Sequence, residues 1–224
     1  MSHIGYFIFE GPDGCGKTTI MKKVQEKLTT QHEWKLNRNI ISTRAPGFTE
    51  FGAKMREIAL TYPSIDPLTR QIIYMADTVN YYEAFLKHVN YGDIILQDRT
   101  SYISSVVYGV SDGVPISNIA RVLSIYKPMK ADCLFVINVP KDVRESRKKA
   151  DSGRVDYFES KPIEFHDSVD GMYRSLISDD SLRLIVSDIV HLDDVVYLNN
   201  FNVDHVADDI CDTIIDYINR KFGV

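Results

Sequence analysis

A short glycine-rich segment is the part of the chain whose residue types and spacing point most directly to chemistry. Residues 11–18, Gly-Pro-Asp-Gly-Cys-Gly-Lys-Thr, match the pattern G-x-x-x-x-G-K-[ST] between an apolar run and a stretch of helical periodicity. Glycines let backbone N–H groups approach phosphate oxygens, the lysine binds the β- and γ-phosphates, and the threonine hydroxyl binds Mg²⁺. The segment therefore predicts a nucleotide-binding site with Mg²⁺, formed by Gly11, Gly14, Cys15, Gly16, Lys17, Thr18 and Thr19, where the bound nucleotide would be ATP if the chain is a kinase.

A second polar pair follows the apolar run at residues 94–96. Asp98 would lie at the carboxyl end of a central strand, where a carboxylate can hold Mg²⁺ together with Thr18. Arg99 would reach a phosphate with its two-pronged guanidinium group. Neither a base-reading N-K-x-D motif nor a D-x-x-G switch follows the glycine-rich segment, which argues against a GTPase.

Strand and helix signals alternate along the whole chain. The predicted strands and helices must position the glycine-rich segment and the pair Asp98 and Arg99. Helical stripes separate the apolar runs, as in the last helix, where Val206, Ile210, Ile214 and Ile218 share one face. Such alternation is typical of an α/β fold, here a three-layer P-loop fold with a five-stranded parallel sheet between helices. The predicted strands are Ile4–Phe9, Ile40–Thr43, Asp93–Leu96, Leu134–Val139 and Val195–Leu198. For residues 181–194 the pattern leaves a strand pair and a short helix equally open.

Length, composition and charge exclude several classes of protein. The 224 residues contain 26 basic and 31 acidic side chains, giving a net charge of -5, so a duplex-binding surface is not expected. No apolar run is long enough to span a membrane, and the start does not resemble a secretion signal. Three widely spaced cysteines form neither a disulfide framework nor a metal pattern. We expect one domain over residues 1–224, in a cytoplasmic protein that binds neither nucleic acid nor membrane.

Several motifs, taken in order, resemble the thymidylate kinase family. Residues 9–19 are similar to the opening of these kinases, and Thr43-Arg44-Ala45-Pro46-Gly47-Phe48-Thr49, with Gly52 and Arg56, is similar to their T-R-E-P-G-G-T segment. Residues 72–78 resemble the L-L-F-A-A-D-R helix, and Asp98-Arg99 with residues 104–108 resembles D-R-Y-x-x-S-S-x-A-Y. The resemblance runs to Tyr173 and implies transfer of a phosphoryl group from ATP to a deoxypyrimidine monophosphate.

The resemblance also implies roles for individual residues. Asp13 would face the acceptor sugar and phosphate, Arg99 would bind the acceptor phosphate, and Tyr74 would stack on the base. Catalytic residues would then be Asp13, Lys17, Arg99, Arg147 and Arg154, and the acceptor site would comprise Asp13, Arg44, Pro46, Tyr74, Thr78, Arg99, Ser104, Ser105 and Tyr108. The family's dimerisation implies a homodimer through helices near Asp66–Lys87 and Ser101–Val110.

A basic segment would form the lid, at about residues 144–160. Gly14 stands where one branch of the family has a catalytic arginine, and in the other, bacterial-type branch the lid supplies this cation. The segment contains Arg144, Arg147, Lys148, Lys149 and Arg154, and a solvated charged helix face is the alternative interpretation.

The sequence departs from the family pattern at Ala45, Phe48, Thr100 and Thr78. Thr78 matters most, because it replaces the arginine that reads the pyrimidine base in the family. We therefore expect a thymidylate kinase with relaxed base choice, using dTMP but also dUMP or a 5-substituted dUMP. A deoxynucleoside kinase is the alternative enzyme, although Ala45 offers no catalytic acid after the second strand. A nucleotide-binding protein without turnover is the non-enzymatic alternative.

Overall fold

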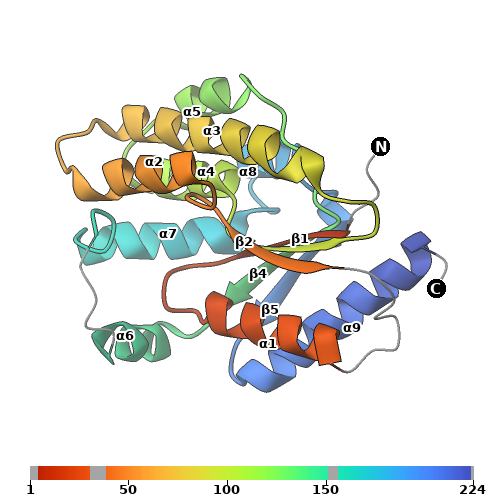
Figure 1. Cartoon of the computed structure of the whole chain (residues 1–224). Helices are drawn as coiled ribbons and strands as arrows, with labels where there is room; N and C mark the ends of the chain where they lie inside the picture. Colours follow the sequence, from red (N-terminus) through yellow and green to blue (C-terminus); the bar gives the residue numbers. More distant parts are fainter. Residues whose placement is uncertain (1–4, 31–38, 151–155, 223–224) are drawn as a thin grey trace.

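A parallel sheet with helices on both faces forms the centre of the chain (Figure 1). The computed structural model describes residues 5–30, 39–150 and 156–222. Its sheet has the strand order β2-β3-β1-β4-β5, and each pair of neighbouring strands is parallel. The strands are β1 (Gly5–Glu10), β2 (Ile40–Arg44), β3 (Ile94–Asp98), β4 (Cys133–Asn138) and β5 (Val195–Asn199). The five predicted strands are confirmed, with ends that differ from the prediction by at most two residues.

Helices cover both faces of the sheet. Helices α1 and α9 pack against one face, and α2, α3, α4, α5, α7 and α8 cover the other (Figure 1). The helices are α1 (Lys17–Thr30), α2 (Glu50–Thr61), α3 (Pro67–Ala84), α4 (Ser101–Ser111), α5 (Ile116–Leu123), α6 (Lys141–Ala150), α7 (Ile163–Ser175), α8 (Asp180–Ser187) and α9 (Val203–Phe222). Single 3-10 turns occur at Leu86–His88 and Leu192–Asp194.

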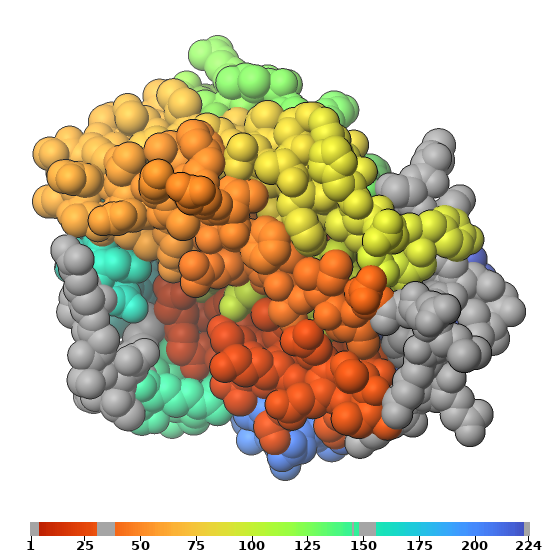
Figure 2. All heavy atoms as spheres, in the orientation of Figure 1, coloured from red at the N-terminus to blue at the C-terminus, as the bar shows by residue number. Residues whose placement is uncertain are grey.

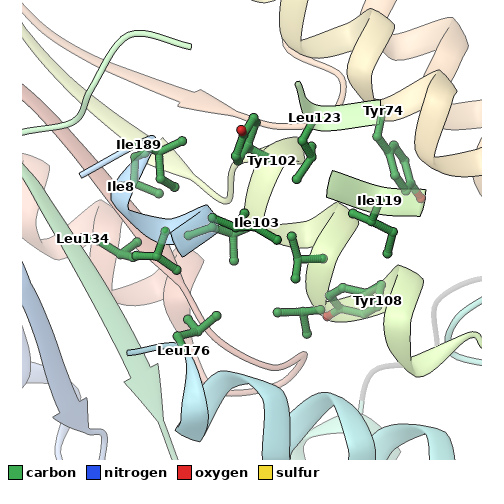
Figure 3. Packing of buried hydrophobic residues seen from close by; sticks show 14 of the residues in the cluster. Ile8, Tyr74, Tyr102, Ile103, Tyr108, Ile119, Leu123, Leu134, Leu176 and Ile189 are labelled. Atoms are coloured by element: carbon green, nitrogen blue, oxygen red, sulfur yellow. The ribbon is translucent and has the colours of Figure 1, made fainter. Parts of the chain in front are cut away.

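Alternating side chains of the strands supply two separate cores. In β1, Tyr6 and Ile8 face the layer of α3, α4 and α7, whereas Phe7 and Phe9 face α1 and α9. Successive residues of a strand point to opposite faces, and a sheet covered on both sides can therefore be apolar at every position. Figure 3 shows part of the first core, where Ile8 and Leu134 of the sheet approach Ile103 of α4.

Residues 181–194, which the sequence left open, begin as a helix. Asp179 caps α8 by accepting hydrogen bonds from the backbone N–H groups of Ser181 (3.0 Å) and Leu182 (3.0 Å). Leu182, Ile185 and Val186 are buried on one side of this helix. The three- and four-residue spacing of apolar side chains therefore outweighed their β-branched character.

The cysteines, the helix hydropathy and the clustering of acidic, histidine and cysteine side chains limit the functional interpretation. Cys15, Cys133 and Cys211 are all buried free thiols. Within the described ranges, no helix is long and apolar enough to cross a membrane. The same ranges contain no cluster of three or more His, Cys, Asp or Glu side chains that could hold a metal ion by themselves.

The carboxyl ends of the strands bring polar side chains to one edge of the sheet. Glu10 ends β1, Asp98 ends β3 and Arg44 ends β2, and the register pairs Arg44 with Asp98. In open parallel sheets, ligands bind outside this edge, near the strands where the chain order reverses. Here that position lies between β1 and β3, at the glycine-rich loop.

Candidate active site

The glycine-rich loop joins β1 to α1 and uses a backbone that only glycine adopts easily. Gly11, Gly14 and Gly16 have φ of 143°, 81° and 91°. A Cβ atom on Gly11 would lie 2.1 Å from the carbonyl oxygen of Ile137, so no larger residue fits there. Asn200, which follows β5, donates from Nδ2 to the carbonyl oxygen of Cys15 at 2.8 Å. The loop is thus fixed from two neighbouring strands.

Lys17 lies at the start of α1 with its ammonium group folded into the loop. Its Nζ donates to the carbonyl oxygens of Gly11 (3.0 Å) and Pro12 (3.1 Å), and lies 3.7 Å from Sγ of Cys15. Only 7% of the Lys17 surface is exposed. The helix N-terminus and this charge together make the loop attractive to phosphate. The predicted ATP residues Gly11 to Thr18 thus form the loop and the start of α1, with Thr19 exposed on the first turn of this helix.

Thr18 and Asp98 form the predicted Mg²⁺ pair. The Thr18 hydroxyl donates to Oδ2 of Asp98 at 2.8 Å, although the two residues are 80 positions apart in the chain. A hydroxyl and a carboxylate are hard oxygen ligands, and Mg²⁺ commonly takes only one or two such protein groups beside nucleotide phosphates and water. This donor set fits the ion.

Arg99 lies next to Asp98 and is held by several acceptors. Its backbone has φ of 66°, and its N–H donates to the carbonyl oxygen of Phe9 at 2.9 Å. Its side chain donates from Nη1 to the hydroxyl of Tyr173 at 2.7 Å and forms an ion pair with Asp13 through Nη2. Glu10 lies 3.5 Å from Nη1. These contacts direct the guanidinium group toward the loop.

Glu10 is a fully buried carboxyl group behind Arg99. It accepts from the backbone N–H of Thr100 at 2.8 Å and from the Tyr173 hydroxyl at 2.8 Å. Burial raises the pKa of Glu10, while Arg99 and these hydrogen bonds act in the opposite direction. Because the carboxyl group is inaccessible, its part in the site is to orient Arg99.

A pocket opens beside Arg99. Two of its walls are aromatic, with Tyr74 from α3 and Tyr108 from α4, and the Tyr108 hydroxyl donates to Oδ2 of Asp13 at 2.9 Å. The remaining lining combines charge with apolar surface: Asp13, Pro46, Arg56, Leu60, Arg99, Ser104, Asp156 and Phe158. Figure 2 shows the recess below α2 and α3, with atoms of the first strand and loop in red at its floor. Flat aromatic walls next to two arginines suit a base attached to an anionic group.

Most of the predicted acceptor residues lie in this pocket, but three do not. Thr78 lines a separate cavity, beside Tyr6 and Gln97, and its hydroxyl donates to the carbonyl oxygen of Tyr74 at 3.0 Å. Ser105 is fully buried within α4, outside the pocket lining. Arg44 is exposed, and its Nε donates to the carbonyl oxygen of Gly47 at 3.3 Å.

The predicted lid begins as α6, and the two arginines of this helix make different contacts. Arg144 forms a buried two-pronged ion pair with Asp170 of α7. Arg147, one turn later, reaches the loop and donates from Nη1 to the carbonyl oxygen of Gly14 at 3.4 Å. Arg154, the other predicted lid cation, lies outside the described residues.

Several lining residues were not predicted to belong to the site. Arg56 of α2 faces the pocket and donates from Nη1 to the carbonyl oxygen of Pro46 at 3.5 Å. Phe158 packs on Tyr108, with ring centroids 5.0 Å apart. Arg56 could have been predicted, because it belongs to a segment that resembles a family motif. No local sequence pattern indicates that the side chains of Asp156 and Phe158 line the pocket.

Comparison with known proteins identifies the family. Residues 9–195 match the family model described as Thymidylate kinase. A thymidylate kinase of Malacoplasma penetrans is 32% identical over 223 residues, covering 96% of this chain and 97% of the relative. The chain belongs to the thymidylate kinase family. The family's thymidylate kinase from Caldanaerobacter subterraneus subsp. tengcongensis is also 32% identical, over 188 residues that cover 82% of this chain and 87% of the relative.

Solved structures of this family have the same fold. The thymidylate kinase of Ehrlichia chaffeensis superposes with a TM-score of 0.65 at 19% identity, covering 95% of this chain and 99% of that one. The enzyme from Candida albicans gives 0.66 at 19% identity, covering 97% and 93%. The predicted family and the predicted five-stranded α/β fold are therefore confirmed, while the bacterial-type lid class stays a prediction.

Proposed function

We propose that this chain is a thymidylate kinase that transfers the γ-phosphoryl group of ATP to the phosphate of dTMP, giving dTDP and ADP. The observation that carries this proposal is the pocket between the loop and α3, where Arg56 and Arg99 accompany the aromatic ring of Tyr74. A nucleoside would need no such pair of cations, whereas a nucleoside monophosphate does. Membership in the family supports the same assignment.

The donor would lie in the glycine-rich loop. Lys17 would leave its carbonyl partners to bind the β- and γ-phosphates, and the loop N–H groups would bind the remaining phosphate oxygens. Thr18 and Asp98 would hold Mg²⁺, an ion that neutralises phosphate charge during transfer. Alignment and charge neutralisation account for most of the catalysis in such reactions.

The acceptor phosphate would lie between Arg99 and the loop. Its oxygen attacks the γ-phosphorus, the bond from that phosphorus to the β–γ bridging oxygen breaks, and ADP leaves with the released charge. Arg99 and Arg56 would hold the acceptor phosphate, and Asp13, fixed by Arg99 and Tyr108, would face the sugar and phosphate. Tyr74 would stack on the base, beside Ser104.

The lid would supply the cation that stabilises the transferring group. Arg147 supports this role because it reaches the carbonyl oxygen of Gly14 from α6. Arg154 is proposed on the basis of the motif resemblance alone. A charge that acts only in the transition state raises kcat without tightening substrate binding.

A coupled assay of ADP release tests this function against its alternatives. A thymidylate kinase releases ADP with dTMP and not with thymidine, whereas a deoxynucleoside kinase gives the reverse. A non-catalytic nucleotide-binding protein releases ADP with neither. Lys17→Ala, purified in parallel, controls for contaminating kinases.

We also propose relaxed base choice. Thr78 is short and bonded to its own helix, so it offers no charged donor to a pyrimidine 4-oxygen. Loss of one charged hydrogen bond is worth roughly 1.5–3 kcal/mol, or about ten- to a hundredfold in discrimination. The test compares kcat/KM for dTMP, dUMP and dCMP in the wild type and in Thr78→Arg. Equally sharp rejection of dUMP and dCMP by both proteins would contradict this proposal.

A homodimer through α3 is the proposed assembly. Ile72 of α3 is 50% exposed and Phe51 of the neighbouring α2 is 43% exposed, which leaves apolar surface for a partner. Residues 101–109 of α4, the other predicted helix, are already buried within the chain. The proposed setting is the cytoplasm, where ATP and deoxynucleotides are available. Sedimentation as a monomer at micromolar concentration would contradict the dimer.

A further inference from the structure

Helix α7 carries buried polar side chains on the face that packs toward the active site. Asp170 and Tyr173 are one helical turn apart, with 7% and 2% of their surfaces exposed. Their buried neighbours on α7, Phe165 and Val169, are apolar and pack in the main core. A buried carboxylate and a buried hydroxyl cost free energy unless they are paired, and their partners identify their function.

Tyr173 connects α7 to the acceptor side of the site. Its hydroxyl accepts from Nη1 of Arg99 at 2.7 Å and donates to Oε2 of Glu10 at 2.8 Å. Glu10 itself lies 3.5 Å from the same Arg99 nitrogen. The hydroxyl therefore stands between the arginine and its buried counter-ion and sets the direction of the guanidinium group.

Asp170 connects the same helix to the lid. It pairs with Arg144, which is 4% exposed and lies on α6 one turn before Arg147. Arg147 in turn reaches the carbonyl oxygen of Gly14 in the phosphate loop. The ion pair thus fixes the first turn of α6, and Arg147 extends from the next turn toward the phosphate loop.

We propose that Asp170 and Tyr173 are positioning residues that set two cations of the reaction from one helix, Tyr173 through Arg99 and Asp170 through Arg147. This inference rests on the proposed function of the site. Stability alone does not account for the ion pair, because apolar residues of similar volume are often as stabilising as a buried ion pair. The spacing of one turn makes α7 a single element on which both the acceptor cation and the lid depend.

Tyr173→Phe tests the acceptor side, because it removes only the hydroxyl. We expect KM for dTMP to rise about tenfold, with KM for ATP unchanged and kcat within about twofold, as loss of one hydrogen bond to a charged group predicts. Val169→Ala is the matched control: it removes buried apolar atoms from α7 and leaves the Tyr173 hydroxyl in place. It should lower the Tm and leave KM for dTMP unchanged. If the two variants change KM for dTMP equally, Tyr173 has only a structural role.

Asp170→Asn tests the lid side through a double-mutant cycle with Arg147→Ala. We expect Asp170→Asn to lower kcat about tenfold in the wild type and by less than about twofold when Arg147 is already alanine, since it acts through that residue. An equal loss of kcat in both backgrounds would overturn the inference.

A second variant keeps this test decisive if Asp170→Asn fails to fold. Arg144→Met combined with Asp170→Leu replaces the pair by apolar side chains and should retain a wild-type Tm. Without the two-pronged contact it should still lose about tenfold in kcat, and full kcat would contradict the proposed role. The wild type separates the two hypotheses: if it does not phosphorylate dTMP, the proposed function fails, whereas an active wild type with unaffected variants refutes only the role of α7.

Discussion

Replacing Gly52 by alanine tests how α3 holds the walls of the pocket beside Arg99. Gly52 lies in α2, and a Cβ atom there would be 2.1 Å from Oδ1 of Asp77 and 3.0 Å from Oγ1 of Thr49. Asp77 is only 1% exposed, so its carboxyl group cannot turn into solvent. The added methyl group must displace the carboxylate or the helix.

The displaced carboxylate carries contacts to both sides of the pocket. Asp77 accepts from the backbone N–H of Gly47 at 3.2 Å and from the hydroxyl of Ser101 at 3.0 Å. Gly47 follows Pro46, and Ser101 begins α4 two residues after Arg99. Moving Asp77 therefore loosens both the Pro46 wall and the strand end that carries Arg99.

The change in the free energy of unfolding is the sum of one stabilising and two destabilising effects. Alanine is favoured over glycine inside a helix by about 1 kcal/mol. Overpacking a buried site costs about 1–3 kcal/mol, and unpaired buried hydrogen-bonding groups cost about 1–3 kcal/mol more. We expect Gly52→Ala to be less stable by about 1–5 kcal/mol, which for a chain of this size lowers the Tm by about 3–15 °C. KM for dTMP should rise more than KM for ATP.

Gly171→Ala is the matched control for thermal unfolding. Gly171 lies inside α7, and a Cβ atom there meets nothing within 4 Å. This variant should gain about 0.5–1 kcal/mol in stability, because no contact opposes the helix propensity of alanine. Calorimetry on both variants separates the contact from the propensity. If Gly52→Ala is as stable as Gly171→Ala, the contact between α2 and Asp77 does not hold the pocket as described.

Further predictions concern the phosphate loop, the lid arginine, the Mg²⁺ site and the buried thiols. Lys17→Ala should lower turnover by orders of magnitude while the chain still folds, and retained activity would contradict the donor assignment. Arg147→Ala should lower kcat more than it raises KM, whereas an effect on KM alone would make Arg147 an ordinary surface charge. Asp98→Asn should raise the Mg²⁺ concentration needed for half-maximal rate, and an unchanged Mg²⁺ titration would remove Asp98 from the metal site. Burial raises the pKa of the Cys133 and Cys211 thiols to about 12, so neither should react with iodoacetamide at pH 8 until the chain unfolds; mass spectrometry of the native protein checks this.

Local patterns were sufficient to predict the strands and the phosphate loop. The left-handed backbone of the glycines and the hydrogen bonds of Lys17 to Gly11 and Pro12 are local, so the spacing of these residues in the sequence indicates most of the loop geometry. Thr18 and Asp98 were predicted as a pair because parallel strands end at one edge of the sheet. These features depend on short-range periodicity and on one general property of α/β folds.

The pocket beside Arg99 depends on tertiary packing that periodicity does not encode. Thr78 and Tyr74 share a helix, yet the turn between them places Thr78 against a different cavity. Phe158 lines the pocket next to a long-range contact, in which the backbone N–H of Tyr157 donates to the carbonyl oxygen of Leu60 at 3.0 Å. The pairing of Arg144 with Asp170 likewise joins residues 26 positions apart across two helices. Motif resemblance located the region, whereas the side-chain directions required the three-dimensional structure.

The most direct test of the central claim is product analysis with ATP labelled on its γ-phosphate. Incubation of the wild type with Mg²⁺ and dTMP should move the label into dTDP, with one ADP formed for each dTDP, as separated by anion-exchange chromatography. The same experiment with thymidine should leave the label in ATP. Arg99→Met should lower kcat/KM for dTMP by at least about tenfold, because Arg99 is the guanidinium group held beside the loop by Asp13 and Tyr173. Label transferred to thymidine and not to dTMP would contradict the proposed activity.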